Sequence, residues 1–276
     1  MEKFIMQNTI NSIITGYNVM RKKGLKSLKS CVTLSDKLKW LAIFDNNDLK
    51  VKCADKIKAK EYVREKLGID ISVPILKIYD NVDQINIDEL PDKFIIKANH
   101  GSGKQFYEIV NNKNNVNLDN LKNKFQKSLN IDYSCAGGEL FYHFINRKIF
   151  AEELIDEEFL DYKVYCCNNN IMIIKNVYYV NGITESIYDV NGIPLDYAKG
   201  NIIKKAQKPI DKNLVSKLVE YSKILSKDFK FVRCDFIVTK NKIYFGELTF
   251  IPASGRDTFY TKELDLWLGK HLIINV

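Results

Sequence analysis

The feature that most restricts the fold is the stretch FVRCDFIVTKNKIYFGELTF at residues 231–250, which has the pattern of two apolar strands joined by a polar turn. Successive side chains of a strand point to opposite faces of its sheet. One face of the first strand is apolar, and it carries Val232, Cys234, Phe236 and Val238. The other face carries Arg233 and Asp235, while the second strand adds Glu247 and Thr249. Three charges within strands this apolar require an explanation.

The register of this hairpin suggests what the charges do. A three-residue loop from Lys240 to Lys242 would set Asp235 opposite Glu247, and facing carboxylates repel each other. A divalent cation between them removes that repulsion, and Mg²⁺ takes carboxylate oxygens together with phosphate oxygens. The alternative is a surface face on which Arg233 bridges both acids. The hairpin by itself leaves both interpretations open.

A second candidate site follows an apolar strand in the segment FIIKANHGSGKQ, residues 94–105. Lys97 lies near the end of that strand, and the turn Gly101-Ser102-Gly103 comes just after it. The lysine supplies positive charge, and glycines let backbone N–H groups close on phosphate oxygens. The segment therefore suggests a phosphate site, although a tight hairpin with an incidental lysine explains it equally well.

The remaining chain mixes helices with antiparallel strands and lacks the regular strand–helix–strand alternation of a parallel sheet, so the predicted class is α+β. Residues 1–68 have helical patterns, with Ser35 as a candidate cap and Asp55 as the start of a further helix. Further strands are expected near 75–80, 94–110, 148–155 and 161–190, and further helices at 117–130 and 211–226.

Composition restricts location and partners. The 276 residues carry a formal net charge of +8, and the densest basic cluster is RKKGLKSLK at residues 21–29. The cluster lacks the interleaved aromatic residues of a single-strand binder, so we expect no nucleic-acid partner. A solvated helix face is one interpretation, and peripheral contact with a membrane or an anionic glycan is the other. With no long apolar run and no zinc-type spacing among six cysteines and three histidines, we expect a cytoplasmic protein with reduced thiols.

Several segments occur together in one order. They are DKLKWL (36–41), ADKIKAKEYV (54–63), LPDKFIIKANHGSG (90–103), AEELI (151–155), DYKVYC (161–166), VRCDF (232–236) and FGELTFIPASG (245–255). The ordered set resembles the ATP-grasp superfamily, specifically the TupA-like group associated with bacterial surface polysaccharide synthesis. The resemblance implies a helical N-terminal region at 1–75, followed by a lid subdomain at 76–153 and a C-terminal subdomain at 154–276 that together clasp ATP.

The resemblance also implies which residues bind the nucleotide. Lys56 and Lys97 match the two lysines that hold phosphates, and Lys163 is a further candidate whose alternative is a surface strand lysine. The mobile loop that closes over the phosphates is matched by Gly101, Ser102 and Gly103. The hinge strand that lines the base is matched by Glu152, Glu153, Leu154 and Ile155. Asp161 matches an acid that binds ribose hydroxyls.

Metal binding and catalysis are assigned in the same way. Asp235 and Glu247 match the magnesium-binding acids, and Arg233 matches a cation that steadies the transferring phosphoryl group, with Lys97 as the second catalytic candidate. Many ATP-grasp enzymes have asparagine where Thr249 stands, and a hydroxyl is a weaker magnesium ligand, so the number of ions stays open. Candidates for binding an acidic substrate are Ser254, Gly255 and Arg256.

The implied activity is that of an ATP-dependent carboxylate–amine ligase, which forms an amide through an acyl phosphate in capsule or surface polysaccharide biosynthesis. Its expected requirements are ATP, Mg²⁺, a small acid (a sugar uronate or an amino acid) and an amine. One alternative is a kinase-like ATP-grasp phosphotransferase that acts on a glycan precursor. The other is a non-catalytic basic protein that binds a glycan or a membrane through residues 21–29.

Overall fold

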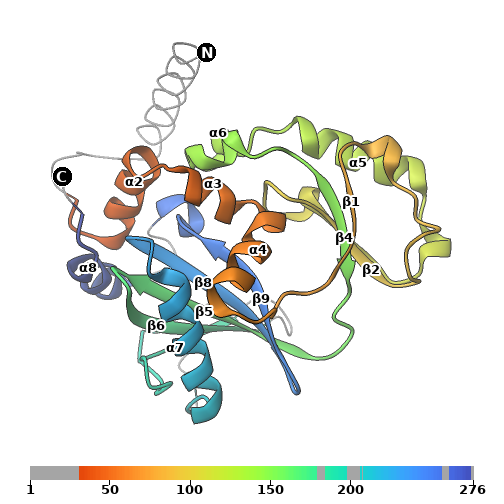
Figure 1. Ribbon diagram of the computed structural model, residues 1–276. Coiled ribbons are helices and arrows are strands. Elements are labelled where there is room, and N and C mark those ends of the chain that lie inside the picture. The colour runs from red at the N-terminus through yellow and green to blue at the C-terminus, as the bar shows by residue number, and fades with distance from the viewer. Residues whose placement is uncertain (1–30, 179–183, 198–205, 207, 257–260, 275–276) are drawn as a thin grey trace.

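The computed structural model describes residues 31–178, 184–197, 206, 208–256 and 261–274. Two antiparallel sheets form its frame, one with the strand order β1-β4-β2-β3 and one with the order β7-β6-β5-β8-β9 (Figure 1). The predicted α+β class is therefore confirmed. The helical pattern expected for the first thirty residues and the basic cluster at 21–29 lie outside the described residues.

The smaller sheet comes first in the chain. Its strands are β1 (Ile75–Tyr79), β2 (Phe94–Ala98), β3 (Tyr107–Val110) and β4 (Ile149–Glu153). Helix α5 (Leu118–Asn130) packs against β2, and the alternation of β2 buries Phe94, Ile96 and Ala98 against it. The side chains of the opposite face, including Lys97, are left to face outward from this core.

The larger sheet contains the charged hairpin of residues 231–250. Its strands are β5 (Phe159–Cys167), β6 (Asn170–Tyr178), β7 (Thr184–Tyr188), β8 (Phe231–Thr239) and β9 (Ile243–Thr249). Helix α7 (Lys212–Ser226) covers one face by packing on β5, β6 and β8. It begins where the Asp211 carboxylate accepts the N–H groups of Asn213 and Leu214, each at 3.0 Å.

The remaining helices extend the core of the larger sheet. They are α2 (Leu34–Phe44), α3 (Asp48–Ala54), α4 (Lys56–Leu67), α6 (Ser134–Gly137) and α8 (Lys262–His271). Buried residues of α2, α3 and α4 belong to the same hydrophobic cluster as β5, β8 and β9, whereas the smaller sheet has its own cluster. The early helices thus share a core with the last third of the chain, and the three-part division of the chain stays a prediction.

Short 3₁₀ turns join these elements, at Val82–Gln84, Lys104–Phe106, Lys113–Asn115, Leu140–Phe144 and Pro252–Gly255. One predicted cap is wrong. The Thr33 hydroxyl, and not that of Ser35, accepts the N–H of Asp36 at 3.1 Å and begins α2. Ser35 lies two positions later in the chain, where its hydroxyl donates to the Asp265 carboxylate at 3.0 Å.

Candidate active site

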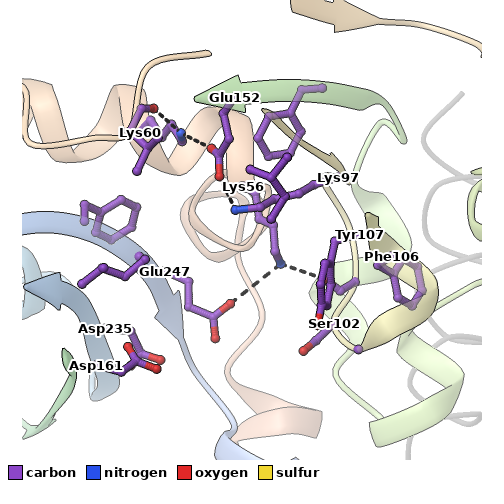
Figure 2. Close-up of a pocket in the computed structure, with 18 of the residues that line it drawn as sticks. Lys56, Lys60, Lys97, Ser102, Phe106, Tyr107, Glu152, Asp161, Asp235 and Glu247 are labelled. Atoms are coloured by element: carbon purple, nitrogen blue, oxygen red, sulfur yellow. Dashed lines mark hydrogen bonds and ion pairs between the residues drawn. The ribbon is translucent and has the colours of Figure 1, made fainter. Parts of the chain in front are cut away.

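A cavity of about 380 Å³ lies between the two sheets and is lined from both (Figure 2). One part of its wall is apolar, with Val73, Ile95, Phe150, Ile237 and Phe245. The other part is charged, with Lys56, Lys60, Lys97, Glu152, Asp161, Lys163, Asp235 and Glu247. An apolar slot beside a charged pocket has the two surfaces that a planar base and its phosphates require.

The charged hairpin has the predicted register at the site. Asp235 pairs with Glu247, and Arg233 pairs with Thr249. The register shifts by one residue just beyond this point, so Phe236 pairs with Phe245 instead of residue 246. Gly246 is the extra residue, and a Cβ there would lie 3.0 Å from the backbone oxygen of Asp235. Glycine therefore permits a bulge that the sequence pattern did not reveal.

Arg233 lies between the two acids. Its Nε donates to Asp235 Oδ1 at 2.6 Å, and its Nη2 reaches Glu247 Oε1 at 3.3 Å. The same nitrogen donates to Thr249 Oγ1 at 3.0 Å, and that hydroxyl donates to Glu247 at 2.8 Å. The expected arginine bridge is present, but it does not lie on an open surface, because the side chains of Arg233 and Asp235 are only 12% and 6% exposed.

Positive charge surrounds the two carboxylates. Burial acts to raise the pKa of Glu247, but the nearby Lys56, Arg233 and Lys163 lower it to about 2. Lys163 Nζ lies 3.4 Å from Asp235 Oδ2 and 3.6 Å from Asp161 Oδ2. Glu247 is therefore ionised at neutral pH and able to act as a ligand.

The oxygen donors suit magnesium only in part. Asp235, Glu247 and Thr249 offer two carboxylates and a hydroxyl, which are hard ligands of the type Mg²⁺ takes. Within the described residues, no group of three or more His, Cys, Asp or Glu side chains is placed to hold a metal ion. A magnesium ion at this hairpin would therefore need further oxygens, from phosphates and water, to complete its coordination.

Two lysines meet at one buried carboxylate on the opposite wall (Figure 2). Lys97 donates to Glu152 Oε1, and Lys60 donates to Glu152 Oε2 at 2.5 Å and to the backbone oxygen of Val73 at 2.5 Å. The Glu152 side chain is 4% exposed. Burial acts to raise the pKa of Glu152, but Lys97 and Lys60 lower it overall.

Lys60 was not among the predicted site residues. A signal for it was nonetheless present in the sequence, because Lys56 and Lys60 are four residues apart and lie on the same face of a helix. Asp55 begins this helix as predicted, since its carboxylate accepts the N–H of Ile57 at 2.9 Å. The helix start thus points two lysines toward the cavity.

The glycine loop closes the cavity from the side of the smaller sheet. Lys56 Nζ donates to the backbone oxygen of Gly101 at 2.8 Å and lies 3.8 Å from Glu247 Oε2. A Cβ at Gly101 would lie 2.5 Å from the ring of Phe106, so the loop needs glycine at this position. Gly103 has φ of +100°, a conformation that other residues rarely adopt. Lys56 therefore joins this loop to the hairpin acids across the cavity.

The predicted hinge residues do not all line this cavity. Of the segment Glu152–Ile155, only Glu152 does so, and its carboxylate is bound by Lys97. Glu153 is exposed, and its N–H donates to the backbone oxygen of Pro74 at 3.1 Å. The roles of residues 152–155 in nucleotide binding stay predictions. The role of Asp161, which lines the cavity beside Lys163, also stays a prediction.

The predicted substrate residues are divided in the structure. Ser254 lines a second cavity of about 320 Å³, which adjoins the first and shares Ser102, Lys163 and Glu247 with it. The Ser254 hydroxyl donates to Glu139 at 3.3 Å. Gly255 and Arg256 line neither cavity, and Arg256 is exposed. Contact of these two residues with a substrate remains only a prediction.

Comparison with protein families agrees with this geometry. Residues 36–273 match the family described as TupA-like ATP-grasp. The chain belongs to this family. The TupA-like ATP-grasp assignment confirms the predicted resemblance and the predicted fold, which is typical of ATP-dependent ligases.

Solved structures are similar to this chain at low identity. An L-amino acid ligase from Bacillus licheniformis is 13% identical with a TM-score of 0.51, over 86% of this chain and 55% of that chain. A D-alanine–D-alanine ligase from Helicobacter pylori is 17% identical with a TM-score of 0.49, over 87% and 69% of the two chains. The corresponding ligase from Bacillus anthracis is 15% identical with a TM-score of 0.45, over 72% and 57%. This chain thus spans little more than half the length of two of them, and the likeness concerns the fold alone.

No curated protein matched the chain in a sequence search. In the part of the chain that the structure describes, no helix combines the length and the apolar character needed to cross a membrane.

Proposed function

We propose that this chain is an ATP-dependent carboxylate–amine ligase, and that the cavity between the sheets binds ATP. The observation that carries the proposal is the meeting of three distant segments around one charged space. Lys56 lies within 2.8 Å of the glycine loop and 3.8 Å of Glu247, while Lys97 lines the same cavity from β2. Lysines and a glycine loop facing a pair of acids suit a metal-bound polyphosphate.

The apolar wall would hold the base, and the lysines would hold the phosphates. Lys97 is paired with Glu152, and Lys60 also binds that carboxylate. Phosphate oxygens can therefore draw Lys97 away without leaving Glu152 unpaired. Charge-assisted contacts of this kind contribute about 1.5–3 kcal/mol each.

The residues of the hairpin fit phosphoryl transfer. A magnesium ion held by Asp235, Glu247 and Thr249 would neutralise charge on the terminal phosphates and align them. Ligation of the two acids by the ion would free the Arg233 guanidinium to bind the transferring phosphoryl group and the incoming acid. Such catalysis depends on position and charge, and it requires no serine or cysteine nucleophile.

The proposed reaction has two steps. A carboxylate oxygen of the substrate forms a bond to the γ-phosphorus as the bond from that phosphorus to the β–γ bridging oxygen breaks, giving an acyl phosphate and ADP. The amine then attacks the acyl carbon, inorganic phosphate leaves, and the amine loses a proton to give the amide. We further propose a cytoplasmic enzyme of capsule or surface polysaccharide biosynthesis whose acid is a sugar uronate or an amino acid.

The test combines binding with turnover. MgATP should raise the Tm of the protein, and ADP should form only when both an acid and an amine from a panel of uronic acids, amino acids and small amines are present. Lys97→Ala should weaken the nucleotide effect, whereas Lys93→Ala, which changes an exposed lysine paired with Asp156, should leave it unchanged. ADP formation with an acid alone would instead favour the kinase-like alternative. No response to MgATP would refute a nucleotide site and leave the non-catalytic alternative.

A further inference from the structure

On the basis of the proposed function, the second cavity indicates which class of carboxylic acid the ligase uses. Its wall includes three cations, Lys163, Lys175 and Arg233, and three carboxylates, Glu139, Glu185 and Glu247. Three tyrosines, Tyr133, Tyr142 and Tyr165, also line it, and the rest of the wall includes Ser102, Thr249 and Ser254. A hydrocarbon ligand would strip water from these groups without replacing their hydrogen bonds. The cavity therefore suits a compact and strongly hydrophilic molecule.

The buried pair Lys175–Glu185 is the feature that neither the fold nor nucleotide binding explains. Lys175 lies on β6 and Glu185 on the edge strand β7, and their side chains form an ion pair while being 2% and 12% exposed. The Lys175 ammonium also lies 5.8 Å from the centre of the Tyr165 ring. Burying two charges costs free energy that their attraction barely recovers, and apolar residues of similar size are often as stable. The position of the Lys175–Glu185 pair in a cavity wall indicates that it recognises a ligand.

The sheet relates this pair to the catalytic hairpin. Lys175 pairs with Lys163 across β6 and β5, Lys163 pairs with Asp235, and Asp235 pairs with Glu247. One row of charged residues thus crosses four strands on the same face. Strands are about 4.8 Å apart, so Lys175 is roughly 10 Å from the backbone of Asp235. An acid whose carboxylate lies beside Arg233 would need polar groups at its remote end to reach the Lys175–Glu185 pair.

The pair also restricts the kind of polar group. Lys175 can donate hydrogen bonds and Glu185 can accept them, so ligand hydroxyls, which do both, match the pair without adding charge. A ligand ammonium group would be attracted by Glu185 and repelled by Lys175.

We infer that the second cavity is the acceptor site for a polyhydroxylated carboxylic acid, and that Lys175 and Glu185 bind its hydroxyl groups at the end remote from the carboxylate. The acid's carboxylate is then directed to Arg233 and the shared boundary of the two cavities, where the γ-phosphate is expected. The substrate would thus belong to the sugar acids rather than to the amino acids or fatty acids.

The experiment uses binding, so that it does not depend on finding the amine. The Tm of the full chain is measured with Mg²⁺ and the non-hydrolysable analogue AMPPNP, and again after adding D-glucuronate, D-galacturonate, L-lysine or hexanoate. The sugar acids should raise the Tm further, whereas L-lysine and hexanoate should not. The double variant Lys175→Met/Glu185→Leu removes both charges together and should keep its response to AMPPNP while its affinity for the sugar acids falls at least tenfold.

The exposed pair between Lys77 on β1 and Glu89 in a turn provides the matched control, and Lys77→Met/Glu89→Leu should respond like the unchanged protein. A normal response to AMPPNP with no response to either sugar acid, or with an equal response to hexanoate or L-lysine, would overturn this inference alone. Unchanged sugar-acid affinity in the folded Lys175→Met/Glu185→Leu variant would also overturn it. A missing response to AMPPNP in the unchanged protein would overturn the proposed function and the inference together.

Discussion

Substitution of Glu152 should make the stability of this protein depend more strongly on bound nucleotide. The Glu152→Gln substitution keeps the shape of the side chain but leaves two lysine ammonium groups, Lys60 and Lys97, without their shared carboxylate. Those lysine side chains are 13% and 26% exposed, so neither is fully hydrated. Removing one partner of a buried ion pair costs about 3–5 kcal/mol, and partial access to water favours the lower value, about 3 kcal/mol. For a chain of this size that corresponds to a fall in Tm of roughly 6–12 °C.

Nucleotide should reverse much of this loss, because phosphate oxygens can replace the missing carboxylate beside Lys97. A ligand that binds only the folded state stabilises it by an amount that rises with affinity. The increase in Tm caused by MgATP should therefore be larger in Glu152→Gln than in the unchanged protein. Differential scanning calorimetry with and without MgATP measures both quantities, and Glu153→Gln is the matched control because that neighbour is exposed on the other face. Equal Tm values of the two variants without nucleotide would refute the argument. A Tm increase with MgATP in Glu152→Gln that is no larger than that of the unchanged protein would also refute it.

Three further expectations concern the same site. Lys97→Ala should stay folded, because Glu152 keeps Lys60, while its ATP affinity by calorimetry falls by about 1.5–3 kcal/mol; unchanged affinity would remove Lys97 from the site. Asp235→Asn and Glu247→Gln should both abolish ADP formation, but Asp235→Asn should lower the Tm more, because it leaves the buried Arg233 without its closest acid; an active variant would refute the metal assignment. Hydrogen exchange in the loop at 101–104 should slow when MgATP is added, and an equal rate would argue against a closing lid.

The sequence predicted the hairpin well because alternation and a short turn together set the register at Asp235 and Glu247. It missed the bulge at Gly246, which lies between the site and the turn. A glycine in a strand does not by itself predict a shift in the pairing register of β8 with β9. Repulsion between Asp235 and Glu247 is also opposed by the attraction of both acids to Arg233. Arg233 was assigned to a surface bridge or to phosphate, whereas the structure buries it between both acids, so Asp235→Asn is expected to lower the stability of the protein.

The residues that the sequence missed were those whose role depends on packing between distant segments. Lys60 meets Glu152 from 92 positions away, and no local pattern reports that contact. Lys175 lies in the largely apolar strand β6 and was visible there as an exception, whereas Glu185 lies in the mixed strand β7, and only the pairing of these strands joins the two residues. The family resemblance supplied the roles of matched positions and could not supply these two pairs, which depend on this chain's own side chains.

His100 gives a prediction that concerns the fold instead of the reaction. Its side chain is fully buried at the base of the glycine loop, 3.1 Å from the backbone oxygen of Ser128 and edge-on to Phe106. It therefore packs inside the loop and is not placed to touch phosphate. Burial lowers the pKa of His100 from 6.5 to about 4.

The direction of the pH effect is set by that shift. Below about pH 6.5 the unfolded chain binds a proton at this imidazole that the folded chain does not bind until about pH 4, so stability is complete above this range and is lost as the pH falls through it. From about pH 7 to about pH 5 the free energy of unfolding should fall by about 2 kcal/mol through this residue. Urea unfolding across that range should show the loss in the unchanged protein and in the control His271→Gln, whose side chain is exposed. His100→Gln should remove most of the dependence because glutamine does not titrate, and a slope equal to that of the control would show that His100 is not the titrating group.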